Sequence, residues 1–573
     1  MDLQIKNGIV YDPRNEIYGE KLDIFISNGK IVSEDRCQDA KVIDVNNKIV
    51  MSGGVDAHSH IAGGKVNAGR IMRPEDGRIG LEPKTKITRS CSGYTVPNVY
   101  GIGYRYARLG YTTAFEAAMP LLEAKHTHEE LEEIPIIDKA ALPLFGSNWM
   151  VMEYIKEGDV DKLAAYVAWA LNATKGYGIK IVNPGGGEAW GFRKNVKGLD
   201  DPVPNFEVTP REIIYNLAKV NEMLNLPHSI HVHCNNLGVP GDFPTVLATF
   251  NIPRDIKPSR DRQIMHVTHV MFYSFGGTNW GNVESKADAI AHYLNKHDHV
   301  TIDTGQLIFG SATTMTADGP VQFRNARMFK AKWSNHDIEL EDASGVTPLF
   351  YVRAAPVHAI MWSMGLELAL LTEDPWKVIM TTDHPNGGPF VNYPEVISLL
   401  MSKNKREAEM SKFQESVQKR TVLPTIDREM SWHEIAVMTR AAPAKILGLE
   451  NKGHLGIGAD ADVSVYNINP EQIDSSTEHA EVKKALSSAL YTIKAGEIVV
   501  KEGSIVCTPE GRTFCTKVEV PQEYMDGMLI KLRAKFKDYY SVQESNYIVQ
   551  DHYVPHPITI NTQYRKKIEL AAA

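Results

Sequence analysis

The sequence has few cysteines, and their arrangement excludes several kinds of site. Its 573 residues include five cysteines, and no two of them form a C-x-x-C pair. They are Cys37, Cys91, Cys234, Cys507 and Cys515. This spacing argues against a disulfide framework, a cysteine zinc site and a local iron–sulfur motif. The odd count and wide spacing fit reduced thiols, so we expect a cytoplasmic protein.

Long apolar runs and basic clusters are also missing. Lys and Arg number 62 against 70 Asp and Glu, a formal net charge of -8. The most basic short run, Arg565–Lys567, is typical of a solvated tail rather than of a nucleic-acid surface. No apolar stretch is long enough to span a bilayer, and the charged, strand-like start MDLQIKNGIVYDP does not have the pattern of a signal peptide. We therefore expect neither a nucleic-acid partner nor a membrane span.

The two ends of the sequence share a strand-and-turn pattern. Asn7-Gly8 and Asn28-Gly29 each separate two apolar runs, which predicts a β-hairpin at both positions. Similar short strands return near the other end. We expect one small β-sandwich domain built from residues 1–50 and 455–515. Residues 516–573 have a helical and then an extended pattern, which we interpret as a C-terminal docking tail, although packing on the chain's own domain would explain the same pattern.

Residues 51–454 alternate short apolar strands with amphipathic helices. Two helices begin with capping boxes, Thr209 with Glu212 and Ser431 with Glu434. Repeated strand–loop–helix units predict an α/β fold with a parallel sheet, and we favour a TIM-like (β/α)8 barrel. Barrels of this kind place their chemistry on the loops at the carboxyl ends of the strands.

Polar residues stand at these strand ends. They are His58 and His60 in GGVDAHSH, Lys180 in GIKIV, His231 and His233 in IHVHC, His266 and His269 in IMHVTH, and Asp383 in VIMTTD. Residues two apart on a strand point to the same face. A single buried histidine is usually an ordinary core residue, so the hypothesis of a shared site depends on their joint occurrence. A charged lysine within an apolar strand also needs a partner.

These side chains are suitable ligands for two metal ions. Zinc binds imidazole nitrogen and carboxylate oxygen, and catalytic sites keep one position open. One ion could bind His58, His60 and Asp383, and a second could bind one histidine from each of the two later pairs. A neutral Lys180 can react with carbon dioxide to give a carbamate, which would bridge the two ions and remove the buried ammonium.

Several motifs together resemble the amidohydrolase superfamily. They are VIDVNNKIVMSGGVDAHSH, GYTTAFE, TTDHP, TRAAPAKILGL and LGIGADADVSVYN, with the strand lysine and the later histidines between them. More narrowly, PLFGSNWMVMEYIKEGDVD, IKIVNPGGGEAWGF, THVMFYSFGGTNWG, TMTADGP and TTDHPNGGPF resemble the A-type subunits of formylmethanofuran dehydrogenases from methane-metabolising archaea. The resemblance implies two Zn2+ or other divalent ions bridged by N6-carboxylated Lys180. The ligands that it implies are His58, His60, Lys180, His233, His269 and Asp383.

The choice within each histidine pair depends on the resemblance. VHCN is similar to the VHAE strand end of the superfamily, which favours His233 over His231. A Thr-His pair before an aromatic loop recurs in the superfamily, which favours His269 over His266, although IMHVT is also similar to the form found in hydantoinases. The other member of each pair could orient the ligand.

The resemblance also implies a reaction. Formate would condense with the amine of methanofuran to give N-formylmethanofuran, in methanogenesis or one-carbon metabolism, and the same site would catalyse the reverse hydrolysis. Asp383 would carry the proton. A tungsten- or molybdenum-pterin partner subunit would make the formate from carbon dioxide, in a complex with iron–sulfur subunits.

Three alternatives remain open. A cyclic-amide hydrolase, such as a hydantoinase or a dihydroorotase, would use the same ligands. A catalytically silent scaffold subunit would keep the fold without metal. A homologue in a bacterial formyltransferase/hydrolase complex would have the same site, so the sequence does not separate it from an archaeal dehydrogenase.

Overall fold

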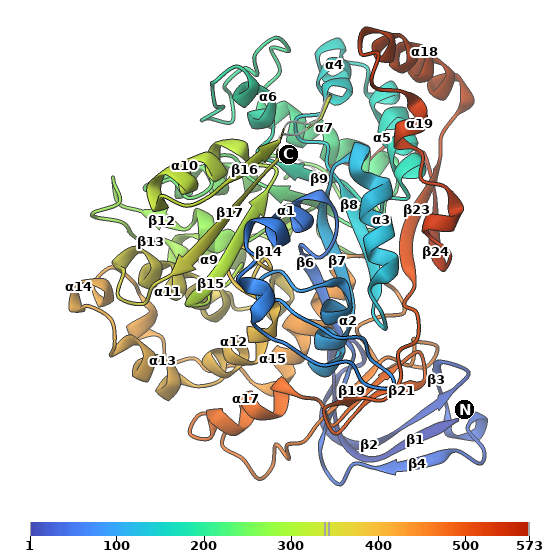
Figure 1. Ribbon diagram of the computed structural model, residues 1–573, viewed down its shortest axis with the longest axis vertical. Helices are drawn as coiled ribbons and strands as arrows, with labels where there is room; N and C mark the ends of the chain where they lie inside the picture. Colours follow the sequence, from blue (N-terminus) through green and yellow to red (C-terminus); the bar gives the residue numbers. More distant parts are fainter. Residues whose placement is uncertain (1, 337–339, 342–343, 571–573) are drawn as a thin grey trace.

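The computed structural model describes residues 2–336, 340–341 and 344–570, and within this part eight parallel strands close a barrel (Figure 1). The strands are β6 (Gly54–Ser59), β7 (Tyr111–Met119), β8 (Asp138–Pro143), β9 (Lys180–Val182), β10 (Ile230–His233), β11 (Met265–Val267), β14 (Val300–Asp303) and β18 (Val378–Ile379). They form two hydrogen-bonded runs, which the bridges Leu144–Lys180 and Ser59–His384 join at both seams. The predicted (β/α)8 barrel is confirmed.

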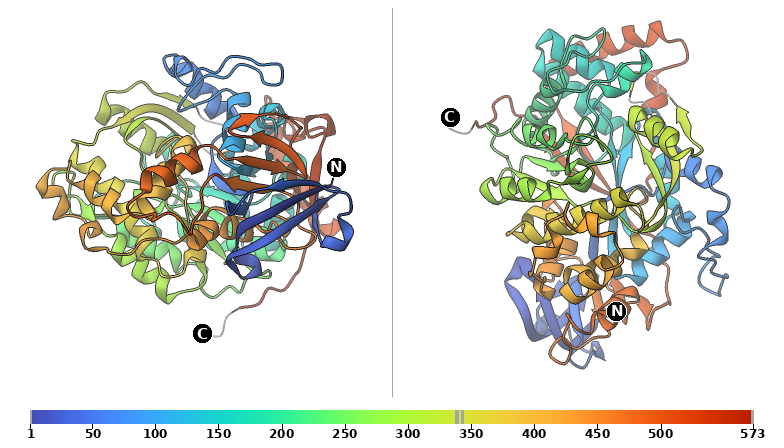
Figure 2. Two further views of the ribbon diagram at one scale, coloured as in Figure 1. Left: turned by 90° about the horizontal axis from the view of Figure 1, so that it is seen from below. Right: turned by 90° about the vertical axis from the view of Figure 1, so that its left-hand side faces the viewer.

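Helices follow the strands and surround the barrel (Figure 2). They include α2 (Val99–Arg108), α3 (Ala124–Glu133), α5 (Val160–Thr174), α7 (Pro210–Met223), α8 (Phe243–Phe250), α9 (Ala287–Lys296), α11 (Pro356–Leu371) and α15 (Trp432–Ala436). The predicted capping boxes are present at the start of α7 and of α15. A wide π-helical turn, Val437–Ala441, follows α15 and leads into α16 (Ala442–Ile446). Pro443 lacks the N–H that a regular α-helical turn needs there, which explains the wider turn.

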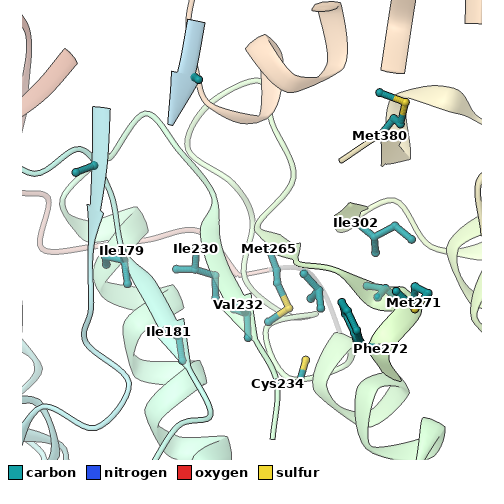
Figure 3. Packing of buried hydrophobic residues seen from close by; sticks show 14 of the residues in the cluster. Ile179, Ile181, Ile230, Val232, Cys234, Met265, Met271, Phe272, Ile302 and Met380 are labelled. Carbon is teal, nitrogen blue, oxygen red and sulfur yellow. The ribbon is translucent and has the colours of Figure 1, made fainter. Parts of the chain in front are cut away.

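The inner and outer faces of the barrel strands differ in polarity. Successive residues on a strand point to opposite faces. Ile179, Ile181 and Val232 are buried among apolar side chains, and Figure 3 shows them with their neighbours on adjacent strands. Lys180 and His231 alternate with these residues and are paired with each other in register across β9 and β10. The alternation therefore points lysine and histidine side chains into the barrel.

A nine-stranded sheet combines strands from both ends of the chain, as expected. The first five are β1 (Leu3–Asp12), β2 (Ile17–Ser27), β3 (Lys30–Val32), β4 (Lys41–Asp44) and β5 (Ile49–Ser52), and the later four are β19 (Val463–Tyr466), β20 (Tyr491–Lys494), β21 (Glu497–Lys501) and β22 (Ser504–Ile505). The antiparallel pairing of β5 with β19 joins the two groups.

One of the two predicted hairpins is correct. Asn28 and Gly29 form the turn between β2 and β3. The hairpin predicted at Asn7-Gly8 is wrong, because β1 continues through these residues with a register shift against β2. Asn7 has a φ of 60°, and its backbone N–H donates to Asp23 Oδ1 at 2.9 Å. The side chain of Asp23 therefore stabilises a bulge where the sequence alone indicates a turn.

A buried ionic network lies between this sheet and the barrel. Its members are Lys452, Lys494, Arg512, Asp138, Asp460 and Asp462. Lys452 Nζ lies 2.6 Å from Asp138 Oδ2 on β8 and 2.6 Å from Asp462 Oδ2 just before β19. The network therefore connects a barrel strand to the composite sheet through paired charges.

A cap segment, which we define as residues 310–336 and 344–351, is inserted between β14 and α11. It contains β15 (Gly310–Thr316), α10 (Gly319–Phe329), β16 (Ser334–His336) and β17 (Ser344–Tyr351). The three strands form an antiparallel sheet in the order β15–β17–β16, separate from the barrel. Figure 1 places this sheet and α10 beside the barrel on the side of β14.

The C-terminal segment extends the barrel's sheet. β23 (Thr513–Glu519) pairs in parallel with β8 and with β24 (Pro557–Gln563), and α18 (Gln522–Asp538) packs against α5. On the outer side, Ile530 is 73% exposed and Tyr540 is 95% exposed. A docking role for this segment remains a prediction, and residues 571–573 lie outside the described residues. Within the described ranges, no helix has both the length and the apolar composition of a membrane span.

Candidate metal centre

The six predicted ligands meet at one cavity. It has a volume of about 270 Å³. His58, His60, Lys180, His233, His269 and Asp383 all line it. All six side chains are buried, and they come from strands β6, β9 and β10 and from the loops after β11 and β18. The fold thus brings together residues that are up to 325 positions apart, His58 and Asp383.

Two histidines and one carboxylate form the first half of the site. His58 Nε2 lies 3.1 Å from Asp383 Oδ1, and His60 Nε2 lies 3.4 Å from the same oxygen. The three ligand atoms lie within 4.8 Å of one another. Asp383 has a φ of 48°, which is uncommon for a residue other than glycine and is typical of strained functional positions. This geometry suits one divalent ion.

Lys180, His233 and His269 form the second half. The rings of His233 and His269 have centroids 4.7 Å apart. Among the described residues, neither Lys180 Nζ nor His269 Nδ1 has a hydrogen-bond partner, although both atoms are buried. His269 has a φ of 39°, and a Cβ on Gly305 would lie only 2.4 Å from the His269 Cβ. Buried polar atoms without partners are costly, so these donors fit a second ion and a modified lysine.

Three of the histidines are each held by a carboxylate at one ring nitrogen, which leaves the other ring nitrogen for a metal ion. The pairs are His58 Nδ1 with Asp303 Oδ2 at 3.0 Å, His60 Nδ1 with Glu116 Oε1 at 3.0 Å, and His233 Nε2 with Asp318 Oδ2 at 3.1 Å. Such partners fix the tautomer and the ring orientation of metal-binding histidines.

Sequence reasoning missed all three carboxylates. Asp303 ends the strand VTID, so the rule that located the ligands would have found it. Its Oδ1 also accepts hydrogen bonds from the His269 backbone N–H at 2.8 Å and from Thr381 Oγ1 at 2.7 Å. Glu116 lies in GYTTAFE and Asp318 lies in TMTADGP, two of the motifs that carry the family resemblance. Asp318 comes from the cap segment, and no strand-end pattern points to it.

His231 and His266 do not line the cavity; His231 lies against the candidate ligand His58, and His266 lies against Asp303, which holds His58. His231 Nε2 is 3.3 Å from His58 Nδ1, and its Nδ1 is 2.9 Å from His228 Nε2. His266 Nε2 is 3.3 Å from Asp303 Oδ2. In each of the two later pairs, one histidine therefore lines the cavity, His233 or His269, and the other lies behind it, His231 or His266.

Burial and neighbouring charges shift the pKa values of the site. Burial lowers the pKa of Lys180 to about 7, because the carboxylates of Asp383 and Asp303 only partly offset the loss of solvation. Burial opposes ionisation of Asp383, but the charges of His58 and His269 outweigh it and hold its pKa well below the usual range. Near pH 7 a substantial fraction of the Lys180 amine is therefore neutral, in the same cavity as the ionised Asp383 carboxylate.

The walls above these residues are mainly apolar. Phe272, Phe275 and Trp280 line one side, and Leu349 and Tyr351 of the cap segment belong to another. Asn386 also lines the cavity: its Nδ2 donates to Asp383 Oδ1 at 2.8 Å, and its Oδ1 accepts from the Met315 N–H at 2.6 Å. The cap segment is thereby connected to the candidate catalytic carboxylate.

Comparisons with known proteins agree with this architecture. Protein FwdA of Methanocaldococcus jannaschii is 51% identical over 559 residues, 96% of this chain and 97% of that protein. The A-type subunit of the formyltransferase/hydrolase complex Fhc of Methylorubrum extorquens is 35% identical, over 90% of this chain and 91% of that relative. The crystal structure of the FhcABCD complex from the same organism with methylofuran matches with a TM-score of 0.88 and 32% identity, over 99% of this chain and 100% of that chain.

The profile of the Amidohydrolase family matches residues 41–500. The resemblances inferred from the sequence motifs, to the amidohydrolase superfamily and to the A-type subunits of formylmethanofuran dehydrogenases, are therefore confirmed. The chain belongs to the amidohydrolase family.

Proposed function

We propose that this chain is the A-type subunit of a formylmethanofuran dehydrogenase and that its cavity makes and hydrolyses the N-formyl bond. Formate and the primary amine of methanofuran would condense to N-formylmethanofuran and water. The observation that carries the proposal is the convergence of six ligand-type side chains, one of them a lysine without a partner, at one buried cavity. The 51% identity to Protein FwdA and the likeness to the Fhc complex support it.

The chain's own residues would hold two divalent cations, which we propose to be zinc. His58, His60 and Asp383 would bind one ion, and His233 and His269 would bind the other. The neutral form of Lys180 Nζ, which its pKa of about 7 makes available near neutral pH, would add to carbon dioxide and release one proton, and the resulting N6-carboxylate would bridge both ions. When bound, such a pair polarises a carbonyl oxygen and lowers the pKa of water.

Asp383 would act as the general base and acid. Its carboxylate is ionised at neutral pH and lies beside His58 and His60, the histidines that would hold the first ion. In hydrolysis it would take a proton from the attacking water and deliver it to the amine nitrogen as the C–N bond breaks. In condensation it would take the amine proton and deliver it to the departing oxygen. Asn386 would hold Oδ1 and leave Oδ2 for proton transfer.

The remaining chemistry would belong to partners. Reduction of carbon dioxide to formate needs a redox centre, and this chain has no cysteine motif for one. We propose a complex with iron–sulfur subunits and with a tungsten- or molybdenum-pterin subunit, in which formate reaches this cavity. A multi-subunit assembly is supported by the Methylorubrum relative, which is named as a subunit of a formyltransferase/hydrolase complex.

The test is direct. Metal-replete protein, in its native complex, is incubated with N-formylmethanofuran, and the formate released is measured together with the bound metal. We expect release that stops after chelation and returns with zinc. No release from protein with about two ions per chain would contradict the proposal, and turnover of hydantoin or dihydrouracil instead would favour the cyclic-amide hydrolase. Less than about one ion per chain in the native complex would favour the scaffold.

A further inference from the structure

The cavity wall contains an arginine that forms no ion pair with the described residues and that the proposed reaction does not use. Arg324 lies on α10 of the cap segment and lines the cavity together with Val321, Met328 and Phe329 of the same helix. These positions recur with helical spacing, so this face of α10 is the cavity face. Arg324 is therefore a cation placed in a largely apolar wall.

The guanidinium of Arg324 is held but not neutralised. Its Nη2 donates to the Leu237 carbonyl oxygen, while its buried Nε has no hydrogen-bond partner among the described residues. No carboxylate of the described chain forms an ion pair with it, and the nearest acidic influence is the charge of Asp318. Burial lowers its pKa, which reflects the incomplete compensation.

The surroundings leave room for this side chain. Gly238 has a φ of +66°, and a Cβ there would lie 3.2 Å from Arg324 Nη2. A larger residue would therefore crowd the guanidinium as well as strain the backbone. The glycine at position 238 therefore leaves space for the Arg324 guanidinium at the cavity wall.

We infer that Arg324 is a carboxylate-binding residue that sets substrate specificity. A partly buried N–H without an acceptor is costly in the free protein, and a carboxylate in the cavity would satisfy both it and the charge. The planar guanidinium matches a carboxylate better than a neutral acceptor does. The carboxylate belongs either to the body of the amine substrate or to formate. This inference rests on the proposed function, because it assumes that the cavity binds the formamide.

The variants are Arg324→Gln and Arg324→Lys in the full complex, with Arg327→Gln as the matched control. Arg327 is on the same helix, is exposed, and stacks over the Phe323 ring at 5.4 Å. It does not line the cavity, so its loss removes one positive charge from α10 without touching the proposed contact.

Two formamides of one furfurylamine separate the sources of the carboxylate, one with a carboxylate-bearing arm and one with that arm as methyl esters. If the substrate body supplies the group, Arg324→Gln raises KM about tenfold for the carboxylate substrate, leaves kcat nearly unchanged and does not affect the ester. If formate supplies it, the KM for formate in condensation rises by a similar factor instead. Arg324→Lys, which keeps the charge but loses the planar fork, falls between the wild type and Arg324→Gln.

Calorimetry with the carboxylate-bearing free amine and with formate measures the same contact without turnover. The inference is overturned if Arg324→Gln binds and turns over every ligand within twofold of the wild type, or if it weakens carboxylate and ester substrates equally. Failure of the wild type and of Arg327→Gln to hydrolyse either formamide would instead contradict the proposed function, and calorimetry would still decide the role of Arg324.

Discussion

Two buried lysines in this molecule have opposite surroundings. Lys452, at the junction of sheet and barrel, is 2% exposed and contacts three carboxylates, whereas Lys180, at the cavity, is 1% exposed and has no hydrogen-bond partner among the described residues. Burial opposes the charge of both. At Lys452 the charges of Asp138 and Asp462 outweigh burial and raise its pKa, while at Lys180 burial dominates and lowers its pKa to about 7. A paired buried lysine cannot be removed without leaving buried carboxylates uncompensated, whereas an unpaired one is available for chemistry.

The largest expected effect is on activity, from Lys180→Met. Because the bridging group is lost, formate release from N-formylmethanofuran falls by roughly a thousandfold. The fold is retained, since methionine fills the space of an amine that has no partner to lose. Steady-state rates, bound metal and the denaturant midpoint are measured together. A variant with wild-type rates would show that this lysine is not part of the reactive centre.

The complementary change, Lys452→Met, acts on stability. Removing this ammonium leaves Asp138, Asp460 and Asp462 short of one positive charge, which costs about 3–5 kcal/mol of the free energy of unfolding. The folded fraction keeps near-normal turnover because the cavity is untouched. Denaturant titration followed by fluorescence checks the stability. If Lys452→Met lost turnover but kept its stability, Lys452 would have a role in activity rather than in stability, and the contrast with Lys180 would be wrong.

A third change removes a carboxylate behind the ligands, Asp303→Asn. Asp303 accepts hydrogen bonds at both carboxylate oxygens: Oδ2 from His58 Nδ1, and Oδ1 from Thr381 Oγ1 and the His269 backbone N–H. In asparagine one of these oxygens is replaced by an NH2 group, which cannot accept. Metal affinity and kcat fall by about 10- to 100-fold. Competition with a chelator measures the affinity. The control is Asp374→Asn. Asp374 Oδ1 accepts a hydrogen bond from the Trp376 backbone N–H, and Asp374 does not line the cavity.

The smallest effect, when measured over a single pH unit, is a pH dependence of stability in the metal-free, carbon-dioxide-free chain. The pKa of Lys180 is about 7 in the folded state against an ordinary value of 10.5, so between these pH values the unfolded chain binds the extra proton. Stability contributed by this residue therefore rises with pH across that window and is lowest below pH 7. The stability advantage of Lys180→Met over the wild type shrinks by at most about 1.4 kcal/mol per pH unit. An advantage independent of pH would contradict the lowered pKa.

The sequence predicted the barrel and a shared place for the strand-end side chains for one physical reason, whereas the choice of six ligands among them came from the family resemblance. The carboxyl ends of parallel strands meet at one edge, so His58, Lys180 and Asp383 could be assigned to a common place without knowing the intervening loops. Alternation alone does not separate His231 from His233, because residues two apart share a face and only their depth along the strand differs.

Other features depend on contacts that a local pattern does not contain. The Asn7-Gly8 turn signal is overridden by Asp23, which holds the bulge from another strand. Asp318 reaches His233, and Arg324 reaches the cavity wall, only because the cap segment folds back onto the barrel. The specificity of the cavity is therefore less predictable from sequence than its reactive centre.

The pairing of β5 with β19 also has a consequence for synthesis of the chain. The first strands leave the ribosome long before their partner at Val463–Tyr466 exists. At ordinary translation rates that interval is roughly 20 to 80 seconds. During this time the edge of β5 that will pair with β19 is unpaired and can form hydrogen bonds with strands of other chains. A holdase that shields nascent strands should therefore matter more for this protein than for a barrel whose terminal strands pair with their neighbours in sequence.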